Sequence, residues 1–304
     1  MHIVSYRTSV GARGVGLLED GELVPLTEVS SMAQLLALPL AQLRSLVDEA
    51  GQDRGPRVPV DTVRLLPPLD GRGEVWCSGV TYERSRGARM EESTEQSVYD
   101  RVYVAERPEL FLKSPAWRLV TDREPIGIRA DSGHDVPEPE LAVVVNAHGE
   151  TVGYTVCNDV SSRSIEGENP LYIPQAKVFA GGCALAPGIR PAWEVTDPTD
   201  LGITVEVRRD GETAFSGETS TAQLARKLDE LVEFLTRANT FPDGAVLATG
   251  TGIVPEMDFT LRPGDVVDIR IDQVGRLTNT VSVGVEPFTW LDAHDTRPTL
   301  EEDR

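Results

Sequence analysis

Two apolar runs, residues 141–145 and 152–157, constrain the fold of this chain more than any other feature of its sequence. The polar stretch NAHGET at 146–151 separates them, which predicts an antiparallel hairpin of two buried strands. The first strand begins with Glu138 and Glu140, which share one face because side chains at i and i+2 of a strand point the same way. The returning strand ends at Asp159, so the hairpin brings a third carboxylate near the two glutamates.

These three carboxylates allow two interpretations. A solvated strand end is the simpler one, since the neighbouring prolines suit edges and first strand residues. A metal site is the other, because like charges held this close repel unless a positive charge lies between them. An oxygen-only ligand set suits Mg²⁺ or Mn²⁺ and leaves positions open for water or substrate. His134 is close in sequence, but a lone histidine in a Gly/Asp loop is more often a surface residue than a ligand.

The N-terminal part of the chain predicts a small α+β unit. Residues 1–28 contain short apolar runs around Asp20-Gly21, a good hairpin turn, and residues 32–50 carry a helical stripe of leucines after two possible serine caps. The stretch GQDRGPRVP at 51–59 is rich in Gly, Pro and charge and predicts a linker. We therefore place an N-terminal domain at residues 1–68.

The remainder, residues 69–304, predicts a β-rich catalytic domain that carries the metal site. Several apolar or alternating runs are separated by Gly, Pro and Asp turns, and one helix is expected over 221–239. Few strands alternate with helices, so a doubly wound parallel sheet is disfavoured and the expected fold class is α+β, mainly β. The Gly-x-Gly in TGTGIVP at 249–255 lacks a third glycine and a following helix, so it is a weak dinucleotide signal.

Charge and composition exclude several classes of function. A formal net charge of −20 argues against a nucleic-acid partner, because phosphates need a concentrated basic face. No stretch approaches the ~20 apolar residues that span a bilayer, and the first residues lack the pattern of a secretory signal. Cys77, Cys157 and Cys183 form an odd set without paired spacing, which predicts reduced thiols and a cytoplasmic protein.

Two further segments attract attention. Residues 82–109 mix charges of both signs with few apolar residues, as in an exposed helix or a mobile lid over a site. Lys177 stands in the apolar context IPQAKVFAG, where an unpaired ammonium would be costly. We therefore expect it to have an anionic partner, either an acidic side chain or a substrate carboxylate.

Over roughly residues 70–290 the sequence resembles the fumarylacetoacetate hydrolase family. The string SSRSIEGENPLYIPQAK is most similar to its sugar-acid dehydratase branch, which converts 2-keto-3-deoxy acids such as 2-keto-3-deoxy-D-arabinonate to 2-oxoglutarate semialdehyde. The matching stretches, in order, are RPELFLK (107–113), PEPELAVVV (137–145), GYTVCNDVSSR (153–163), QAK (175–177), TGTGIV (249–254) and LRPGDVVDIRIDQVGRLTN (261–279).

The resemblance implies a mixed-strand β-roll core and a Mg²⁺ ion, or Mn²⁺, held by Glu138, Glu140 and Asp159. It also implies a homodimer or a homotetramer built as a dimer of dimers. The substrate would be a small 2-keto acid, with no nucleic acid and no membrane involved. The ion would act as a Lewis acid on such a substrate, so that its C3 proton becomes acidic and the C4 hydroxyl can leave.

Two positions depart from the hydrolase pattern. Hydrolases of the family carry Asn-Tyr-x-x-His, whose histidine activates water, whereas this chain has Thr81-Tyr82-Glu83-Arg84-Ser85. Without that base the usual hydrolysis of a 1,3-diketone loses its water activator. Ser164 stands where relatives have aspartate, and no role is assigned to it.

The expected activity is that of a metal-dependent hydro-lyase, which needs a base for C3 and an acid for the leaving hydroxide. Lys177 is expected to act electrostatically at the keto oxygen, although a Schiff base is also open to a buried lysine. The role of Glu166 stays open and Lys113 is interpreted as structural. The candidate residues for catalysis are Glu109, as base or water-positioning residue, and Lys177. Those for substrate binding are Arg84, Glu92 and Thr251.

Three alternatives to the dehydratase are considered. A hydrolase of acylpyruvate or fumarylacetoacetate-type diketones predicts the missing histidine. A keto-acid decarboxylase or tautomerase would use the same carboxylate triad. A binding or scaffold protein without turnover predicts that the triad persists while the other candidates are lost, yet Glu109 and Lys177 are both present.

Overall fold

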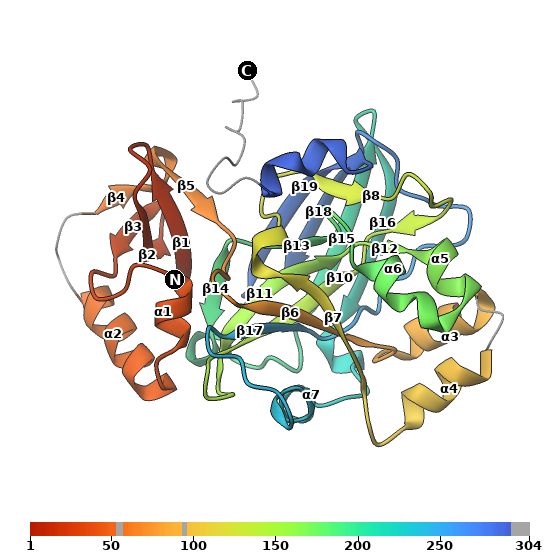
Figure 1. The fold of residues 1–304 in the computed structure, drawn as a ribbon, viewed down its shortest axis with the longest axis horizontal. Helices are drawn as coiled ribbons and strands as arrows, with labels where there is room; N and C mark the ends of the chain where they lie inside the picture. Colours follow the sequence, from red (N-terminus) through yellow and green to blue (C-terminus); the bar gives the residue numbers. More distant parts are fainter. Residues whose placement is uncertain (53–56, 93–95, 293–304) are drawn as a thin grey trace.

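The computed structural model describes residues 1–52, 57–92 and 96–292. A compact N-terminal segment lies beside a larger β-rich body, whose helices cover its lower and outer sides (Figure 1). The β-strands of the protein, in chain order, are β1 (His2–Thr8), β2 (Arg13–Glu19), β3 (Glu22–Pro25), β4 (Val58–Pro59), β5 (Val63–Leu66), β6 (Glu74–Gly79), β7 (Glu109–Pro115), β8 (Ile126–Ile128), β9 (Asp135–Val136), β10 (Pro139–Val145), β11 (Thr151–Asp159), β12 (Ser161–Ser162), β13 (Cys183–Leu185), β14 (Gly188–Pro191), β15 (Gly202–Arg209), β16 (Glu212–Ser220), β17 (Ala245–Ala248), β18 (Val266–Ile271) and β19 (Gly275–Val283). The α-helices are α1 (Met32–Leu36), α2 (Leu40–Gln52), α3 (Glu83–Glu92), α4 (Gln96–Val104), α5 (Arg163–Glu168), α6 (Ile173–Lys177) and α7 (Leu228–Thr236).

The N-terminal hairpin forms as the sequence predicts. Asp20 and Gly21 both have positive φ, 51° and 79°, and join β2 to β3, as a tight turn between right-twisted strands requires. The helix expected over 32–50 is instead two helices, α1 and α2. Pro39 lies between them, and the residue before a proline is disfavoured in the helical region. Ser31 caps α1 by accepting the Gln34 N–H.

Strands from both ends of the chain share one large sheet. Its order is β4-β3-β2-β1-β14-β11-β10-β17-β6-β7, and β1 pairs with β14 through Ile3 opposite Ile189. Most neighbours are antiparallel, but β17 and β6 are parallel, as are β19 and β8 in the smaller sheet. A mainly β, mixed-strand core is therefore confirmed. The boundary at residue 68 stays a prediction, because the sheet continues across it.

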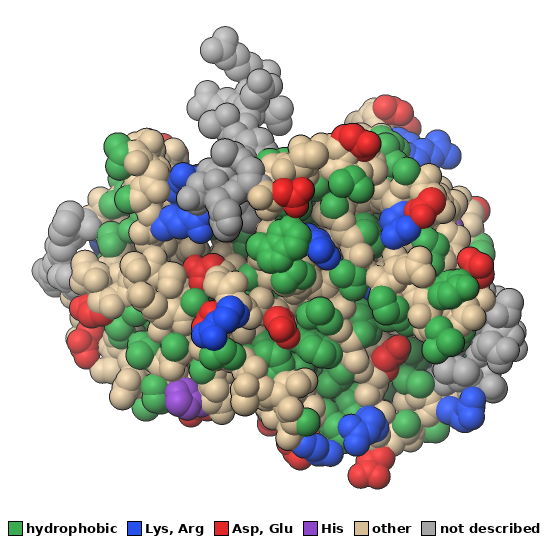
Figure 2. Space-filling view, in the orientation of Figure 1, with side chains coloured by type: hydrophobic (Ala, Val, Ile, Leu, Met, Phe, Trp, Pro, Cys, Tyr) green, Lys and Arg blue, Asp and Glu red, His purple; other side chains and the backbone are tan. Residues whose placement is uncertain are grey.

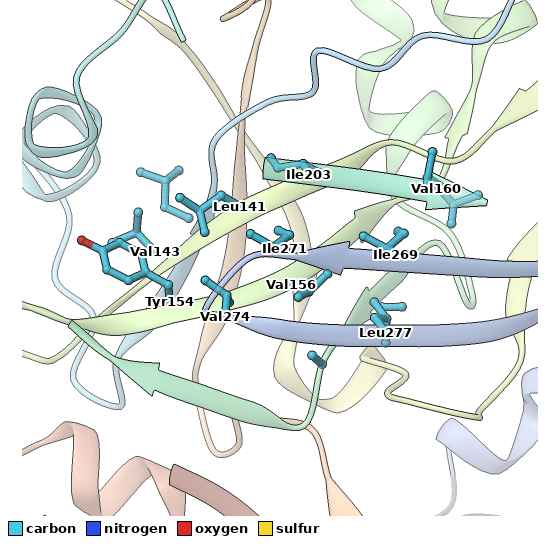
Figure 3. Packing of buried hydrophobic residues seen from close by; sticks show 14 of the residues in the cluster. Leu141, Val143, Tyr154, Val156, Val160, Ile203, Ile269, Ile271, Val274 and Leu277 are labelled. Carbon is cyan, nitrogen blue, oxygen red and sulfur yellow. The ribbon is translucent and has the colours of Figure 1, made fainter. Parts of the chain in front are cut away.

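Strand β10 is buried on both faces and separates two apolar clusters. Leu141 and Val143 pack with residues of β11 and of the smaller sheet, such as Ile203 and Ile269 (Figure 3). Ala142 and Val144 point to the other face, where they pack with the N-terminal helices. Because successive side chains alternate, both faces of this strand are covered and its sequence is a continuous apolar run.

Of two predicted helical segments, one agrees with expectation and the other is shorter. The charged segment 82–109 forms α3 and α4, which agrees with a helical interpretation. The helix expected over 221–239 is shorter, because residues 221–223 form a 3₁₀ turn and the Ala225 N–H donates to the Thr81 carbonyl instead of continuing a helix. In the described ranges, no helix has the length and apolar character needed to cross a membrane.

Candidate active site

The β10–β11 hairpin brings the three carboxylates together. Glu140 lies opposite Cys157 in the register, and the Asp159 N–H donates to the Glu138 carbonyl at 3.0 Å. One carboxylate oxygen from each of Glu138, Glu140 and Asp159 lies within 4.8 Å of the others, and all three side chains are buried. The sequence-based prediction that the returning strand places Asp159 beside the Glu-x-Glu pair is confirmed.

These carboxylates line a pocket of about 320 Å³, including its open mouth, at the ends of several strands. Both catalytic candidates, Glu109 and Lys177, line the same pocket, and so does Thr251. The lining also contains groups contributed by the start of α3, by α5 and by the loop after β17. The complete lining is Ser78, Gly79, Val80, Ser85, Glu109, Phe111, Glu138, Glu140, Asp159, Glu166, Lys177, Gly250 and Thr251.

Two buried lysines neutralise part of the triad. Lys177 Nζ lies 2.7 Å from Glu138 Oε2, 3.0 Å from Asp159 Oδ2 and 2.6 Å from Ser161 Oγ. Lys113 Nζ lies 2.5 Å from Asp159 Oδ1 and also donates to the carbonyls of Val160 and Lys177. The expectation of an anionic partner for Lys177 is confirmed. Lys113, interpreted from the sequence as structural, fixes the same aspartate from its other side.

Arg163 links the triad to a further carboxylate. Its Nη1 lies 3.2 Å from Glu138 Oε1 and 3.7 Å from Glu166 Oε2. Helix α5, which carries both residues, starts immediately after Ser162, whose hydroxyl accepts the Ile165 N–H. The arginine of the SSR string was not singled out as a site residue, although its position four residues after Asp159 offered a signal.

Glu140 is the least compensated member of the triad. Burial raises the pKa of its carboxyl well above the ordinary value, and the neighbouring Asp159 and Glu138 charges raise it further. Lys177 and the Gly250 N–H, which donates to Glu140 Oε2 at 2.7 Å, act in the opposite direction. Three buried hard-oxygen ligands with excess negative charge fit a divalent cation such as Mg²⁺.

The three cysteines lie directly beneath the triad. Cys77, Cys157 and Cys183 belong to the apolar cluster on the same sheet face and are free, buried thiols. Burial raises the pKa of the Cys77 thiol, and the Asp159 and Glu140 charges raise it further. The three thiols therefore form an apolar layer between the charged pocket and the N-terminal core.

The remaining substrate-binding candidates lie near the mouth or beyond it. Arg84, at the start of α3, is half-exposed and pairs with Glu256 at 2.6 Å, and it is not among the residues that line the pocket. Thr251 lines the pocket, while its hydroxyl exchanges hydrogen bonds with the backbone of Ile253. Glu92 ends α3, but its side chain lies outside the part of the chain whose side chains are described.

The turn after β6 shapes the pocket wall in a way that the sequence does not reveal. Val80 has a φ of 53°, although a β-branched residue is strained in the left-handed region. A side chain at Gly79 would collide with the Glu109 carboxylate, and the Thr81 hydroxyl holds the turn by donating to the Thr249 carbonyl at 2.6 Å. Valine carries no signal for positive φ, so this feature could not be predicted.

Ser85 occupies the wall where hydrolases of the resembled family carry their histidine. Its hydroxyl donates to the Tyr82 carbonyl at 2.9 Å and accepts the Tyr82 N–H at 3.4 Å. Serine has no basic nitrogen that could take a proton from water, and the hydrogen bonds of this hydroxyl are made with the backbone. His134 is not a member of the carboxylate cluster, and burial lowers the pKa of its imidazole.

Comparison with known proteins places this geometry in a family. The chain is 46% identical over 261 residues to a Haloferax volcanii protein named "Probable 2-keto-3-deoxyxylonate dehydratase", covering 84% of this chain and 86% of that one. It is 42% identical over 226 residues to the 2-dehydro-3-deoxy-D-arabinonate dehydratase of Saccharolobus solfataricus, covering 73% and 76% of the two chains. A solved structure of 2-keto-3-deoxy-D-arabinonate dehydratase complexed with magnesium and 2,5-dioxopentanoate superposes with a TM-score of 0.79 at 34% identity, over 93% of this chain and 99% of that one.

A family model confirms the assignment independently. The model described as fumarylacetoacetate (FAA) hydrolase C-terminal matches residues 74–282, a range that contains every residue lining the pocket. The match begins at the first residue of β6 and ends one residue before the end of β19. The chain belongs to the fumarylacetoacetate hydrolase family.

Proposed function

We propose that the protein is a Mg²⁺-dependent dehydratase of a 2-keto-3-deoxy sugar acid, a hydro-lyase that forms 2-oxoglutarate semialdehyde. Relatives at 42% and 46% identity carry the names of such dehydratases, and the similar solved structure holds magnesium with 2,5-dioxopentanoate. That compound is the same semialdehyde under its systematic name. The substrate is a small five-carbon keto acid, and the pathway is one of sugar-acid breakdown.

One observation carries this proposal. The pocket holds the carboxylate triad, Lys177 and Glu109 together, while Ser85 stands at the position of the hydrolase histidine with its hydroxyl bound to backbone. This arrangement keeps the groups that acidify and deprotonate a keto acid and lacks the group that activates water for C–C cleavage. On the face seen in Figure 2, basic side chains are scattered among acidic ones, which favours a small-molecule substrate over nucleic acid.

Glu138, Glu140 and Asp159 would hold the Mg²⁺ ion, which, when bound, supplies Lewis-acid chemistry to a keto acid. Glu109 removes the proton from C3, and the electron pair of that bond forms the C2–C3 double bond of an enolate. The ammonium of Lys177 stabilises the negative charge on the enolate oxygen. The C2–C3 electron pair of the enolate then forms the C3–C4 double bond, the C2 carbonyl is re-formed and the C4–O bond breaks. The leaving hydroxide takes up the proton that Glu109 removed from C3 and departs as water, and proton shifts convert the unsaturated product to the semialdehyde.

Substrate contacts complete the proposal. Thr251 lies in the pocket wall and contacts the substrate carboxylate. Arg84 and Glu92, both on α3, are the candidates for the hydroxylated end of the substrate. For Arg84 this requires that its ion pair with Glu256 opens on binding, which is a small loss because both side chains are largely solvated.

A substrate panel tests the function directly. Purified protein with Mg²⁺ is given 2-keto-3-deoxy acids and acylpyruvates, and a coupled semialdehyde dehydrogenase reports the aldehyde. We expect aldehyde from a 2-keto-3-deoxypentonate and no pyruvate from the acylpyruvates. Pyruvate release without any semialdehyde would establish a hydrolase, and release of CO₂ would establish a decarboxylase with the same triad.

We also propose a homodimer or homotetramer and a cytoplasmic location. Strand β7 is the last strand of the large sheet, and Leu112 on it and Trp117 just after it are exposed, as at an edge covered by another subunit. Light scattering after gel filtration measures the assembly. Three unpaired, buried thiols suit a reducing compartment. The division at residue 68 is tested by expressing residues 69–304 alone.

A further inference from the structure

The backbone at Val80, in the pocket wall, adopts a conformation that is unfavourable for valine. Its φ is 53°, where the Cβ of a β-branched residue comes too close to the following carbonyl oxygen. The other described non-glycine residues with positive φ are all exposed, polar and located in turns: Asp20, Arg123, Asp210 and Gln273. Val80 is instead only 6% exposed and lines the pocket. Strain at a buried apolar residue of a pocket wall points to a function for its side chain.

The surrounding backbone holds Val80 in this conformation. Before it, Gly79 pairs with Glu109 at the end of the β6–β7 ladder. After it, the Thr81 hydroxyl donates to the Thr249 carbonyl at 2.6 Å. Glycine would adopt the same φ without strain, so valine costs stability that glycine in its place would not. The turn therefore requires a positive φ, and the branched side chain serves something other than the turn.

Val80 belongs to an apolar wall beside Glu109. The Glu109 carboxylate lies directly over Gly79, the residue before Val80, since a side chain at Gly79 would collide with it. Phe111, two residues further along β7, is on the same face as Glu109 and also lines the pocket. The centroid of its ring lies 5.7 Å from Lys177 Nζ, so the ring is next to the other catalytic candidate. Apart from the glycines, Val80 and Phe111 are the apolar residues of the pocket lining, whose other members are polar or charged.

We infer that Val80 is a specificity-determining residue whose isopropyl group contacts C3 of a 2-keto acid and excludes acids that carry a hydroxyl there. The inference rests on the proposed function, which places C3 at Glu109. Of the two hydrogens on C3, one faces Glu109 and is removed, and the other faces the apolar wall. A hydroxyl in the second position would leave water without gaining a hydrogen bond from Val80 or Phe111, which lowers affinity. The strained valine thus acts against the wrong ligand by withholding a hydrogen-bond partner.

Calorimetry with the Mg²⁺-loaded protein separates contacts at C3 from contacts at the chelating end of the ligand. Oxalate has only the two-carbon chelating end of a 2-keto acid, whereas 2-oxopentanoate adds the C3 methylene and a short tail without a C4 hydroxyl. Val80→Thr keeps the branched shape and replaces a methyl group by a hydroxyl. We expect this variant to bind 2-oxopentanoate about 10-fold more weakly than the wild type. Its affinity for oxalate should change less than about 2-fold.

A ligand with a hydroxyl at C3 should respond in the opposite direction. 2-Keto-D-gluconate carries one, and its affinity should rise about 10-fold in Val80→Thr, because the new hydroxyl can form a hydrogen bond with it. Val80→Ala removes two methyl groups and should weaken 2-oxopentanoate binding about 10-fold, with oxalate binding unchanged. Val10→Thr makes the same chemical change at a position 89% exposed and should alter none of the affinities.

Several results would overturn the inference. Equal binding of 2-oxopentanoate to the wild type and to Val80→Thr is one, and a parallel loss of oxalate binding, which indicates a general disturbance of the pocket, is another. Absence of a gain for 2-keto-D-gluconate rules out the exclusion of C3 hydroxyls. If Val80→Thr does not fold, Val80→Ala decides by the same comparison of 2-oxopentanoate with oxalate.

A further variant measures the strain itself. Val80→Gly should unfold at a higher urea concentration than Val80→Ala, because glycine adopts positive φ without strain. The reverse order would remove the strain on which the inference rests and so overturn it.

Failure of the proposed function would give a different result. If no sugar acid is dehydrated but Val80→Thr still weakens 2-oxopentanoate binding and not oxalate binding, the dehydratase proposal fails and the contact at C3 stands. If dehydration occurs while Val80→Thr binds both ligands as tightly as the wild type, the reverse holds.

Discussion

One face of the large sheet is apolar in its middle and charged at its end, although both parts are equally buried. Ala142 and Val144 on β10 pack with the N-terminal helices, while Glu140 and Glu138 continue the same face into the pocket. Burying a side chain of the size of valine stabilises the fold by about 1.5–3 kcal/mol, whereas burying a carboxylate destabilises it unless a cation or hydrogen bond compensates.

The difference explains why the charged end needs so many partners. Lys113, Lys177 and Arg163 are all buried and all contact triad carboxylates, yet Glu140 still has a pKa well above its ordinary value, first because of burial and then because of Asp159 and Glu138. Ion pairs of this kind rarely contribute net stability, but breaking one leaves an uncompensated charge. The apolar part therefore stabilises the fold, and the charged part is the proposed site for the cation and the substrate.

The largest effect is expected when the negative charge at the pocket end of this sheet face is removed. Glu138→Gln with Glu140→Gln should abolish Mg²⁺ binding and lower turnover more than about 1000-fold, because two of three oxygen ligands lose their charge. Metal content by mass spectrometry and turnover of the sugar acid measure both. Glu212→Gln with Glu218→Gln, on exposed positions of β16, is the matched control. Unchanged metal content and activity would exclude the metal assignment.

Removing the central cation should have the next largest effect. Lys177→Met is expected to lower turnover about 100–1000-fold without unfolding the protein, since its ammonium contacts Glu138 and Asp159 and is proposed to stabilise the enolate oxygen. Turnover and circular dichroism measure the two properties, and Lys227→Met at an exposed site is the control. Unchanged turnover removes Lys177 from the mechanism. An adduct trapped on Lys177 by borohydride would favour a Schiff base instead.

A substitution in the apolar part should lower the stability of the fold and leave turnover nearly unchanged, which is the opposite of the effect expected for Lys177→Met. Leu36 is fully buried on α1, in the same cluster as Ala142 and Val144, and Leu36→Ala should reduce the free energy of unfolding by about 3 kcal/mol. Urea denaturation measures this, and turnover at 25 °C should stay within about 2-fold of the wild type. Val10→Ala, at a position 89% exposed, should change neither. A large loss of turnover in Leu36→Ala would show that the two parts are energetically coupled.

The smallest effect is expected at Asp135, three residues before Glu138. Burial raises the pKa of its carboxyl to about 6, so the folded protein binds more protons than the unfolded chain between about pH 4 and 6. Stability from this group is therefore present at low pH and is lost as the pH rises through 6. Asp135→Asn should be about 1–3 kcal/mol more stable than the wild type at pH 8, and the gap should close by pH 4.

Chemical denaturation across that pH range measures the gap. Asp210→Asn, in the exposed turn before β16, should show no pH-dependent difference from the wild type. A gap for Asp135→Asn that is equal at pH 8 and pH 4 would mean that the carboxyl does not titrate as its burial requires.

The local sequence pattern was sufficient to predict the β10–β11 hairpin and the grouping of its three carboxylates. The apolar runs, the polar turn and the two-residue spacing of Glu138 and Glu140 fix which side chains share a face, and the similar arm lengths place Asp159 beside them. The Asp20-Gly21 turn was predictable for the same reason, since few residues adopt positive φ. The lengths of the helices were not predictable in this way. Pro39 divides the first expected helix, and the hydrogen bond from the Ala225 N–H to the Thr81 carbonyl delays the start of the second.

By itself, the sequence determined the main strands of the hairpin and of the smaller sheet, which acids point to one side, and that serine stands at the hydrolase histidine position. Only the tertiary structure decided how charge is distributed around the pocket. Lys113 comes from β7, whereas Arg163 and Glu166 come from α5, and their distances to the triad depend on how β7, α5 and the hairpin pack. Side-chain alternation is a local property of the chain, whereas electrostatic interactions depend on distance through space and therefore on the whole fold.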